Sequence, residues 1–516
     1  MPNLFATFVL FTYPLVVIVL FRRMPVSNAL IWSIMGGYLF LPERTGIDLP
    51  LLPELDKDLI PSLTAAIMLL LTPKPPMRRN MDVRGANTRR GQAPVATAAV
   101  AVRHQPSVIA NLCIATLFIA PIGVMLTNTD WVVFGPRVLP GIRLYDAFSM
   151  MLSAGVMLLP FLLARRHLGT HEAHVAMLWT FVKVGFVYSL LILIEVRLSP
   201  QLHRWFYGFH AHDFVQQIRF GGFRPMVFIQ HGLRVGVFML MVVIAAFTLY
   251  KIRASNRPPL GRAGQSATEA PKDKGLPLFV GIYFLAILLI SKVVGAFMIA
   301  MIFVPFLMMT KPSQWRFLAA VTALLVLLYP MARSAGVVPV ERVYNLASII
   351  SEDRAGSFRF RLNNEEAMLE RAAQKPILGW GGWGRSRVYD PVTGADITVA
   401  DGIWVIVFGV SGWVGYIALF GLLTLPAFAY FFAKGQLRYA IASQGLCLIL
   451  ATNLVDLMPN SGLTPVTWMV AGALLGRFER RDQSETQHTE NPRPGVRRRT
   501  NLAVASPRQA RRRPTA

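Results

Sequence analysis

The sequence has few charged residues for its size, few acids among them, and only two cysteines. Of 516 residues, 15% are charged and 54% hydrophobic, and 27 acidic residues stand against 52 basic ones, for a formal net charge of +25. Soluble domains carry about 25% charged residues, so this composition excludes an ordinary soluble domain. It indicates a polytopic membrane protein, for which the bilayer is the solvent.

Cysteine and histidine patterns give no sign of a cofactor. Cys113 and Cys447 both lie within apolar runs, which indicates structural thiols and not a disulfide or a metal site. No spacing typical of zinc sites occurs. We therefore expect neither a metal nor another cofactor.

Long apolar runs are abundant. The first, 4–21, lacks a basic segment before it and a small-residue cleavage site after it, so we expect a retained helix and not a signal peptide. A spanning helix needs about 20 mainly apolar residues. This criterion predicts an all-α membrane protein with 12 or 13 transmembrane helices: 4–21, 28–41, 59–71, 107–126, 147–163, 173–195, 226–250, 276–291, 293–310, 316–333, 410–433, 437–457 and 465–476.

Basic residues are concentrated in three connecting segments. Segment 72–106 has seven basic residues and one acid, 251–275 has six and two, and the tail 477–516 has eleven and four. Such bias favours the cytoplasmic side and fits membrane topology better than nucleic-acid binding. The tail is expected to be disordered and to meet anionic lipid. The predicted regions are 1–333 with helices and an outer loop at 196–225, an extracytoplasmic loop at 334–409, helices at 410–476, and the tail.

One stretch of the late outer loop is unusually rich in glycine and tryptophan. It reads PILGWGGWGRSRVYD (376–390). Glycine permits positive φ and close approach of the backbone to a ligand, and Trp380 and Trp383 could stack on a sugar. A glycine-rich turn packed at the membrane surface explains the same residues. Composition leaves both interpretations open.

The order of elements around this stretch resembles a known family. A short amphipathic helix is expected over 357–376, closed by Pro376. After the stretch come a short helix that opens at Asp401, a Gly-Ser-Gly break at 409–412 and a spanning helix. This succession over 357–423 resembles the O-antigen ligase/polymerase superfamily of bacterial surface-polysaccharide enzymes. RFGGFRP (219–225) is similar to an element of an earlier outer loop in that family.

The resemblance implies a metal-independent membrane glycosyltransferase in the bacterial plasma membrane. It would transfer a glycan from polyprenyl diphosphate to lipid A–core or to a growing polysaccharide at the outer face. The diphosphate leaving group needs cations, and arginine binds phosphate in bidentate geometry. Arg219 and Arg361 match arginines of the family motifs, and Arg224 lies beside the first. Each could instead bind lipid headgroups or an acidic neighbour.

Two residues are candidates for the base that accepts the proton of the acceptor hydroxyl. Family ligases usually have a histidine where this chain has Asp401. A carboxylate can act as a base, but Asp is also a preferred helix N-cap, and both interpretations remain open. His231 follows Arg224 by seven residues, so a helix beginning at Pro225 would place both side chains on one face. His231 is therefore an alternative base or diphosphate contact.

The outer loop 196–225 holds further polar and aromatic residues. A metal site at His210, His212 and Asp213 lacks an obvious further ligand. The pattern favours a lining for a sugar site, with a re-entrant interfacial loop as the alternative. The expected glycan contacts are Trp205, Tyr207, His210 and His212, together with Trp380 and Trp383.

Two other functions remain open. A secondary transporter would share the helix number and charge bias, but typically has paired broken helices in two halves, and no internal repeat is evident. A non-catalytic component of a polysaccharide export or assembly machine would explain the missing histidine. The sequence does not predict the oligomeric state.

Overall fold

The structure is a computed structural model that describes residues 2–48, 53–72, 103–219, 221–256, 275–339, 341–342, 344–345, 348 and 352–481. Most of the basic segments 72–106 and 251–275, and the tail beyond residue 481, lie outside these described residues. The expectations for their disorder and lipid contacts therefore stay predictions.

Each apolar run predicted to be helical contains a helix in the structure, although several bounds differ. The helices are α1 (Leu4–Arg23), α2 (Val26–Phe40), α3 (Leu59–Leu71), α4 (Val108–Leu126), α5 (Leu144–His167), α6 (His171–Leu198), α8 (Gly232–Ser255), α9 (Leu278–Ile290), α10 (Val294–Met309), α11 (Pro312–Ser334), α14 (Ile403–Phe431), α15 (Ile441–Asp456) and α16 (Pro465–Glu479).

Seven of these helices are long and apolar enough to cross a membrane, namely α1, α4, α5, α6, α8, α11 and α14. Helices suit the bilayer because all their backbone hydrogen bonds form within the segment. Several helices also expose large apolar side chains, including Leu112 and Ile119 of α4, Leu190 of α6 and Phe279 of α9. An exposed apolar surface of this kind is what lipid contact requires. The chain is therefore a helical, polytopic membrane protein.

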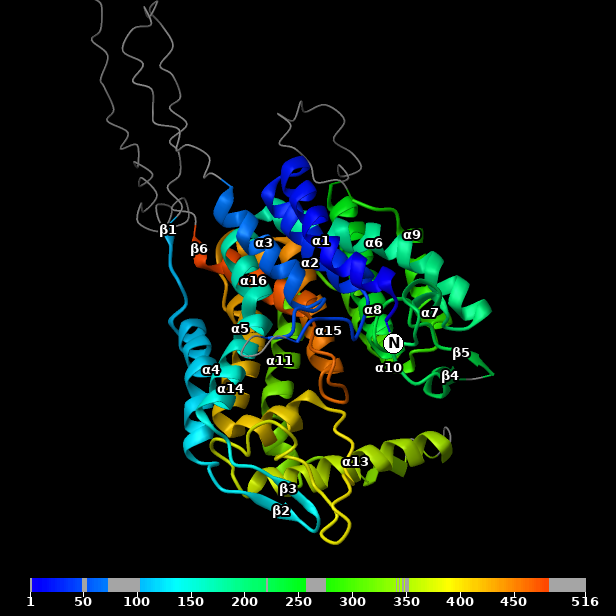
Figure 1. Cartoon of the computed structure of the whole chain (residues 1–516). Coiled ribbons are helices and arrows are strands. Elements are labelled where there is room, and N and C mark those ends of the chain that lie inside the picture. The colour runs from blue at the N-terminus through cyan, green and yellow to red at the C-terminus, as the bar shows by residue number, and fades with distance from the viewer. Residues whose placement is uncertain are drawn as a thin grey trace, which may run out of the picture.

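Shorter elements lie outside the bundle of long helices. In Figure 1, α13 and the hairpin β2–β3 lie at the lower end, and α7 and the hairpin β4–β5 lie above α13 at the right-hand side; we call this part of the molecule the loop end. The pair β1–β6 lies near the opposite end. The bounds are α7 (Leu202–Tyr207), α13 (Glu352–Ala373), β1 (Arg103–His104), β2 (Val132–Phe134), β3 (Arg137–Leu139), β4 (Ile218–Arg219), β5 (Gly222–Phe223), β6 (Arg480–Arg481), and the 3₁₀ turns η1 (Val215–Gln217) and η2 (Gly435–Tyr439).

The amphipathic helix predicted over 357–376 is present as α13, which begins earlier and ends before Pro376. Leu362, Met368 and Ala372 are buried at helical spacing. Ala373, the last residue of the helix, is exposed. The helix thus lies at the loop end with one apolar side packed against the bundle.

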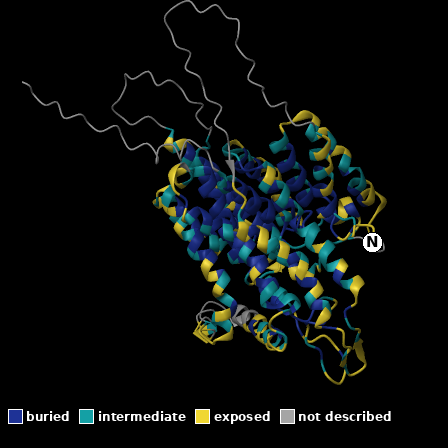
Figure 2. Ribbon diagram, turned by 90° about the vertical axis from the view of Figure 1, so that its left-hand side faces the viewer, coloured by how far each residue is buried: buried dark blue, intermediate teal, exposed yellow. Residues whose placement is uncertain are grey.

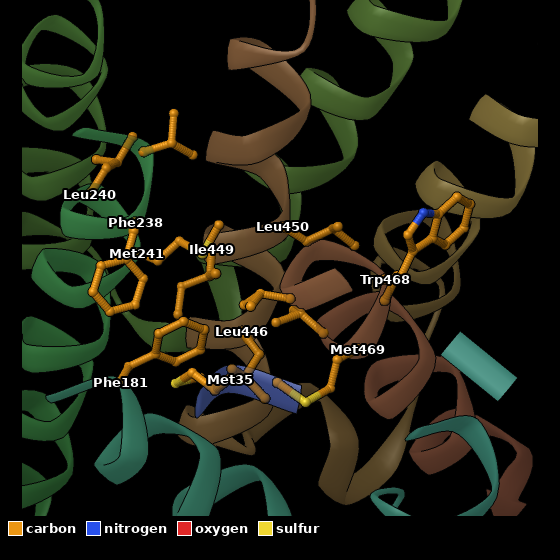
Figure 3. Packing of buried hydrophobic residues seen from close by; sticks show 14 of the residues in the cluster. Met35, Phe181, Phe238, Leu240, Met241, Leu446, Ile449, Leu450, Trp468 and Met469 are labelled. Carbon is orange, nitrogen blue, oxygen red and sulfur yellow. The ribbon is translucent and has the colours of Figure 1, made fainter. Parts of the chain in front are cut away.

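The core runs along the bundle axis between α2, α6, α8, α15 and α16. Figure 2 shows the buried residues inside the bundle and the exposed ones on its outside and at the loop end. In Figure 3, Met35, Phe181, Phe238, Leu446 and Met469 come from these five helices and pack together, and each is at most 1% exposed. Lipid tails are as apolar as these side chains, so the hydrophobic effect does not hold membrane helices together. Close van der Waals packing in the core therefore contributes to their association.

Small residues let α16 approach α5 closely. Gly472 and Gly476 form a Gly-x-x-x-Gly pair on α16, and a Cβ at either position would overlap the carbonyl oxygen of Phe161 or Arg165 on α5. Small residues four apart allow such close backbone contact between membrane helices. At the end of this contact Arg165 forms an ion pair with the buried Glu479, with Nη2 2.6 Å from Oε1.

Candidate functional site

A buried carboxylate organises the segment between α6 and α8. Glu195 is 1% exposed and accepts hydrogen bonds from the backbone N–H groups of Leu202 (2.9 Å), Met226 (2.7 Å) and Val227 (2.7 Å). Val227 takes a positive φ of 54° to do so. One side chain therefore joins α7 to the segment that precedes α8.

This arrangement corrects the predicted start of the helix 226–250. Residues 225–231 are not helical, and α8 begins at Gly232. Val227 has a φ of 54°, outside the right-handed helical region, and the N–H groups of Met226 and Val227 donate to Glu195. The two-turn spacing from Arg224 to His231 on a helix is therefore wrong.

His231 caps α8. Its Nδ1 accepts a hydrogen bond from the N–H of Leu233 at 3.0 Å, and its ring lies edge-on to that of His212, with centroids 4.6 Å apart. Burial, followed by electrostatic interactions with His212, Arg224, Arg234 and Arg361, lowers the pKa of His231 to about 3. The imidazole is neutral at physiological pH, and because Nδ1 is the acceptor, Nε2 carries the proton.

Arginines approach this histidine from two segments. The side chain of Arg224 lies across Gly232, and its buried Nε has no hydrogen-bond partner among the described residues. Burial, then the charges of Arg219 and Arg361, lowers the pKa of Arg224 to about 10. Although no helix links Arg224 to His231, the tertiary structure brings the two together with Arg361.

Three other cations lie near Arg224 and Arg361. Arg219 sits at the end of β4, and its carbonyl oxygen accepts a hydrogen bond from Nζ of Lys292 at 3.3 Å, from the turn between α9 and α10. Arg234 lies in the first turn of α8, next to Gly462. We call Arg219, Arg224, Arg234, Lys292 and Arg361 the cationic cluster.

Asp401 faces this cluster through Arg361. The Nε of Arg361 on α13 lies 3.3 Å from Oδ2 of Asp401, and both residues are partly exposed. Gly402 is the N-cap of α14, and no side chain caps that helix. The capping interpretation of Asp401 is therefore wrong. Both side chains line a cavity of about 260 Å³, described further below.

The glycine-rich stretch packs against a break in α14. Gly412 has non-helical angles (φ 59°, ψ −162°), which confirms the predicted break. The break frees backbone groups, and the stretch satisfies them: Trp380 N donates to Gly409 O (2.8 Å), Gly381 N to Val410 O (2.9 Å), and Trp413 N to Pro376 O (2.8 Å). Satisfying freed backbone groups is essential in a membrane protein.

The two tryptophans of this stretch therefore differ. Trp380 is 9% exposed; its Nε1 donates to Arg371 O at 2.7 Å, and the Arg371 guanidinium stacks on its ring at 3.4 Å. It is part of the packing and is not available as a sugar platform, which corrects that prediction. Trp383 is 54% exposed and lines a largely apolar cavity of about 340 Å³ between α4, α5 and α14. It stays a candidate for contact with lipid or glycan.

The other residues predicted to contact glycan also differ in their exposure and contacts. Tyr207 is buried and donates its hydroxyl to Phe40 O at 2.6 Å, so it holds α7 on α2 and does not face a ligand. Trp205 is exposed. His212 adjoins the cationic cluster through His231, whereas the ring of His210 lies tilted against that of Phe214. The Nδ1 of each of these two histidines is buried without a hydrogen-bond partner in the described part of the chain.

Three residues of the site are not predicted by the sequence patterns. Arg234 lies within the run 226–250, which the sequence predicts as a membrane helix. Tyr329 on α11 and Glu365 on α13 line the same cavity as Asp401. The one available signal was the spacing of four between Arg361 and Glu365, which puts both on one helix face.

No group of three or more His, Cys, Asp or Glu side chains in the described residues could hold a metal ion, and Cys113 and Cys447 are free thiols. The arrangement brings together several cations, a neutral histidine and a carboxylate at the loop end of a membrane bundle. Comparison with protein-family models, with curated proteins and with solved structures finds no match to this chain.

Proposed function

We propose that this protein is a membrane glycosyltransferase that moves a glycan from polyprenyl diphosphate to lipid A–core or to a growing polysaccharide. The observation that carries the proposal is the convergence of Arg224, Arg361 and His231, from separate segments, next to Asp401. Cations held together against their mutual repulsion indicate an anionic ligand, and a diphosphate at a membrane surface fits their number and place.

The chemistry follows from the geometry. The acceptor hydroxyl oxygen attacks the anomeric carbon of the donor, the bond from that carbon to the phosphate oxygen breaks, and polyprenyl diphosphate leaves. The cationic cluster stabilises the charge that develops on the leaving oxygen. The proton of the attacking hydroxyl passes to a base, and Asp401 is the carboxylate beside Arg361.

Asp401 suits the role of base better than His231. A base needs a free lone pair, and the Nδ1 lone pair of His231 accepts the N–H of Leu233 while its Nε2 carries a proton. His231 would therefore donate a hydrogen bond to a phosphate oxygen. Asp401 is not engaged in capping, and its carboxylate borders a cavity.

The proposed location is the bacterial plasma membrane, with the loop end outside and 12 or 13 helices spanning. The basic bias of 72–106, 251–275 and 477–516 supports this orientation. Reporter fusions test it: fusions within those segments should report the cytoplasm, and one at residue 385 the outside. A cytoplasmic residue 385 would place the proposed site on the wrong side and overturn the function.

A deletion strain tests the activity. We expect lipid-linked glycan to accumulate on the outer leaflet and mature polysaccharide to be lost, with recovery on return of the wild-type gene. Glycan trapped on the cytoplasmic side would indicate a transporter. Recovery by an Asp401→Asn, Arg361→Ala double variant would indicate a non-catalytic assembly component.

A further inference from the structure

The cavity beside Asp401 has features that the reaction at the cationic cluster does not use. It has a volume of about 260 Å³ and lies between α11, α13, the start of α14 and the segment after α15. Its polar lining is Tyr329, Arg361, Glu365 and Asp401, and the rest is mainly apolar, with Leu362, Met368, Val405 and Met458 among the lining residues.

Its polar groups form two bonded sets, each with one member on α13. On α13, Arg361 and Glu365 lie one helical turn apart. The Glu365 Oε1 accepts hydrogen bonds from the Tyr329 hydroxyl (3.2 Å) and from Nε of Arg333 (3.1 Å). These bonds hold the Glu365 carboxylate at the cavity wall while Arg361 holds Asp401.

We propose that this cavity binds the terminal sugar ring of the acceptor, with Glu365 and Tyr329 as its recognition residues. The inference rests on the proposed function, since it uses Asp401 as the base. Carboxylate and hydroxyl oxygens bind sugar hydroxyls, while apolar side chains pack against the C–H faces of the ring. Sites for drug-sized ligands span roughly 300–1,000 Å³, so this smaller space suits one ring and not an oligosaccharide.

The charges of the wall restrict the ligand class. Two carboxylates, Glu365 and Asp401, line the cavity. Arg333 is paired with Glu365, and Arg361 belongs to the cationic cluster proposed to bind the diphosphate. A uronic acid would add a third carboxylate at close range, which like-charge repulsion disfavours. The cavity therefore favours a neutral or amino pyranose. Burial raises the pKa of Glu365, with Arg333 opposing this effect, which agrees with an enclosed carboxylate.

Direct binding of simple glycosides tests the inference. The probes are the methyl glycosides of glucose, galactose, mannose, rhamnose, N-acetylglucosamine and glucosamine, with methyl glucuronide as the charged counterpart. Saturation-transfer NMR on the full-length protein in nanodiscs should detect at least one uncharged or amino glycoside and no glucuronide. Binding by none of the six, or equal binding of the glucuronide, overturns the proposal.

Matched variants locate the binding. Glu365→Gln and Tyr329→Phe should weaken glycoside binding about tenfold or more, since a hydrogen-bonding group that reads a substrate hydroxyl is lost. Glu366→Gln is the control, because the neighbouring Glu366 side chain is 60% exposed, against 15% for Glu365, and contacts the same Arg333 at 3.4 Å. Equal effects of Glu365→Gln and Glu366→Gln would refute the assignment.

The outcomes separate the two proposals. In a transfer assay, Glu365→Gln should raise the KM for acceptor and leave the KM for the polyprenyl donor unchanged. If the protein transfers no glycan yet binds glycosides in this pattern, the proposed function fails and the sugar cavity stands. If transfer occurs and Glu365→Gln binds glycosides as tightly as wild type, only the cavity assignment fails.

Discussion

Arg361 and Asp401 are 40 residues apart in sequence, and the Arg361 Nε lies 3.3 Å from the Asp401 Oδ2. The pair joins α13 to the start of α14 at the edge of a cavity, next to the arginines of the β4–β5 hairpin region. Partly exposed ion pairs contribute little to stability, about 0–1 kcal/mol. The pair therefore contributes little to folding, and its position at the cavity is what motivates its role in the proposed reaction.

Replacing Asp401 distinguishes catalysis from structure. Asp401→Asn keeps the shape of the side chain but cannot accept a proton, so we expect glycan transfer to fall at least 100-fold, within the range of general-base contributions. Because Gly402, and not Asp401, caps α14, thermal stability in detergent should stay within about 1 kcal/mol of wild type. Transfer at the wild-type rate would move the search for the base elsewhere in the site. Asp401→His, which introduces the residue usual in similar ligases, is a companion variant that should retain part of the activity.

Lysine substitutions test the arginines of the cluster. Arg361→Lys and Arg219→Lys keep the charge but lose the planar fork that binds phosphate in bidentate fashion, so each should lower transfer about tenfold or more at equal protein level. The matched control is Arg387→Lys, since Arg387 is similarly exposed to Arg361 and pairs with Asp396 away from the cluster. The measurement is transfer per amount of purified protein. Activity unchanged in both Lys and Ala variants of Arg219 and Arg361 would rule out diphosphate binding there.

Glu195 should act as a structural anchor of the site. Glu195→Ala leaves three backbone N–H groups without their acceptor, and hydrogen bonds to charged groups are each worth about 1.5–3 kcal/mol. We expect a loss of several kcal/mol in stability, seen as a clear drop in the melting temperature in detergent. Glu366→Ala, at an exposed position, should cause almost none. A melting temperature equal to wild type for Glu195→Ala would contradict this role.

The glycine-rich stretch allows a test between two neighbouring glycines. Gly379 has φ +72°, and a Cβ there would lie 2.6 Å from Ser411 N and Val410 O, so Gly379→Ala should push the stretch off the break in α14. The left-handed backbone alone costs an alanine about 1–2 kcal/mol. Gly382 has an ordinary φ and no atom within 4 Å of the added Cβ, so Gly382→Ala is the control. Melting temperature and transfer activity should both fall in the first variant only; equal behaviour of the two would show that the docking does not matter.

Much of the fold was predictable from the sequence because the bilayer leaves few choices. An apolar run of about 20 residues must satisfy its own backbone, so the approximate positions of the apolar helices follow from hydropathy, although the start of α8 does not. The glycine break at 412 follows from local sequence. The candidate arginines and Asp401 were also visible, since polar side chains beside apolar runs stand out. Hydropathy does not predict which group a polar side chain will hydrogen-bond or pair with.

The tertiary structure decided which of these residues meet. Glu195, near the end of α6, accepts hydrogen bonds from the backbone N–H groups of Met226 and Val227 in the segment before α8. No local sequence pattern predicts that a carboxylate binds three backbone N–H groups. The sequence predicts that Trp380 lies at the surface. It is buried because its stretch forms backbone hydrogen bonds with the broken part of α14, about 30 residues later in the chain. Tyr329 and Glu365 meet only because α13 packs beside α11 at the cavity. Hydropathy determines where helices form, whereas long-range hydrogen bonds and charge contacts, which depend on packing, determine the site.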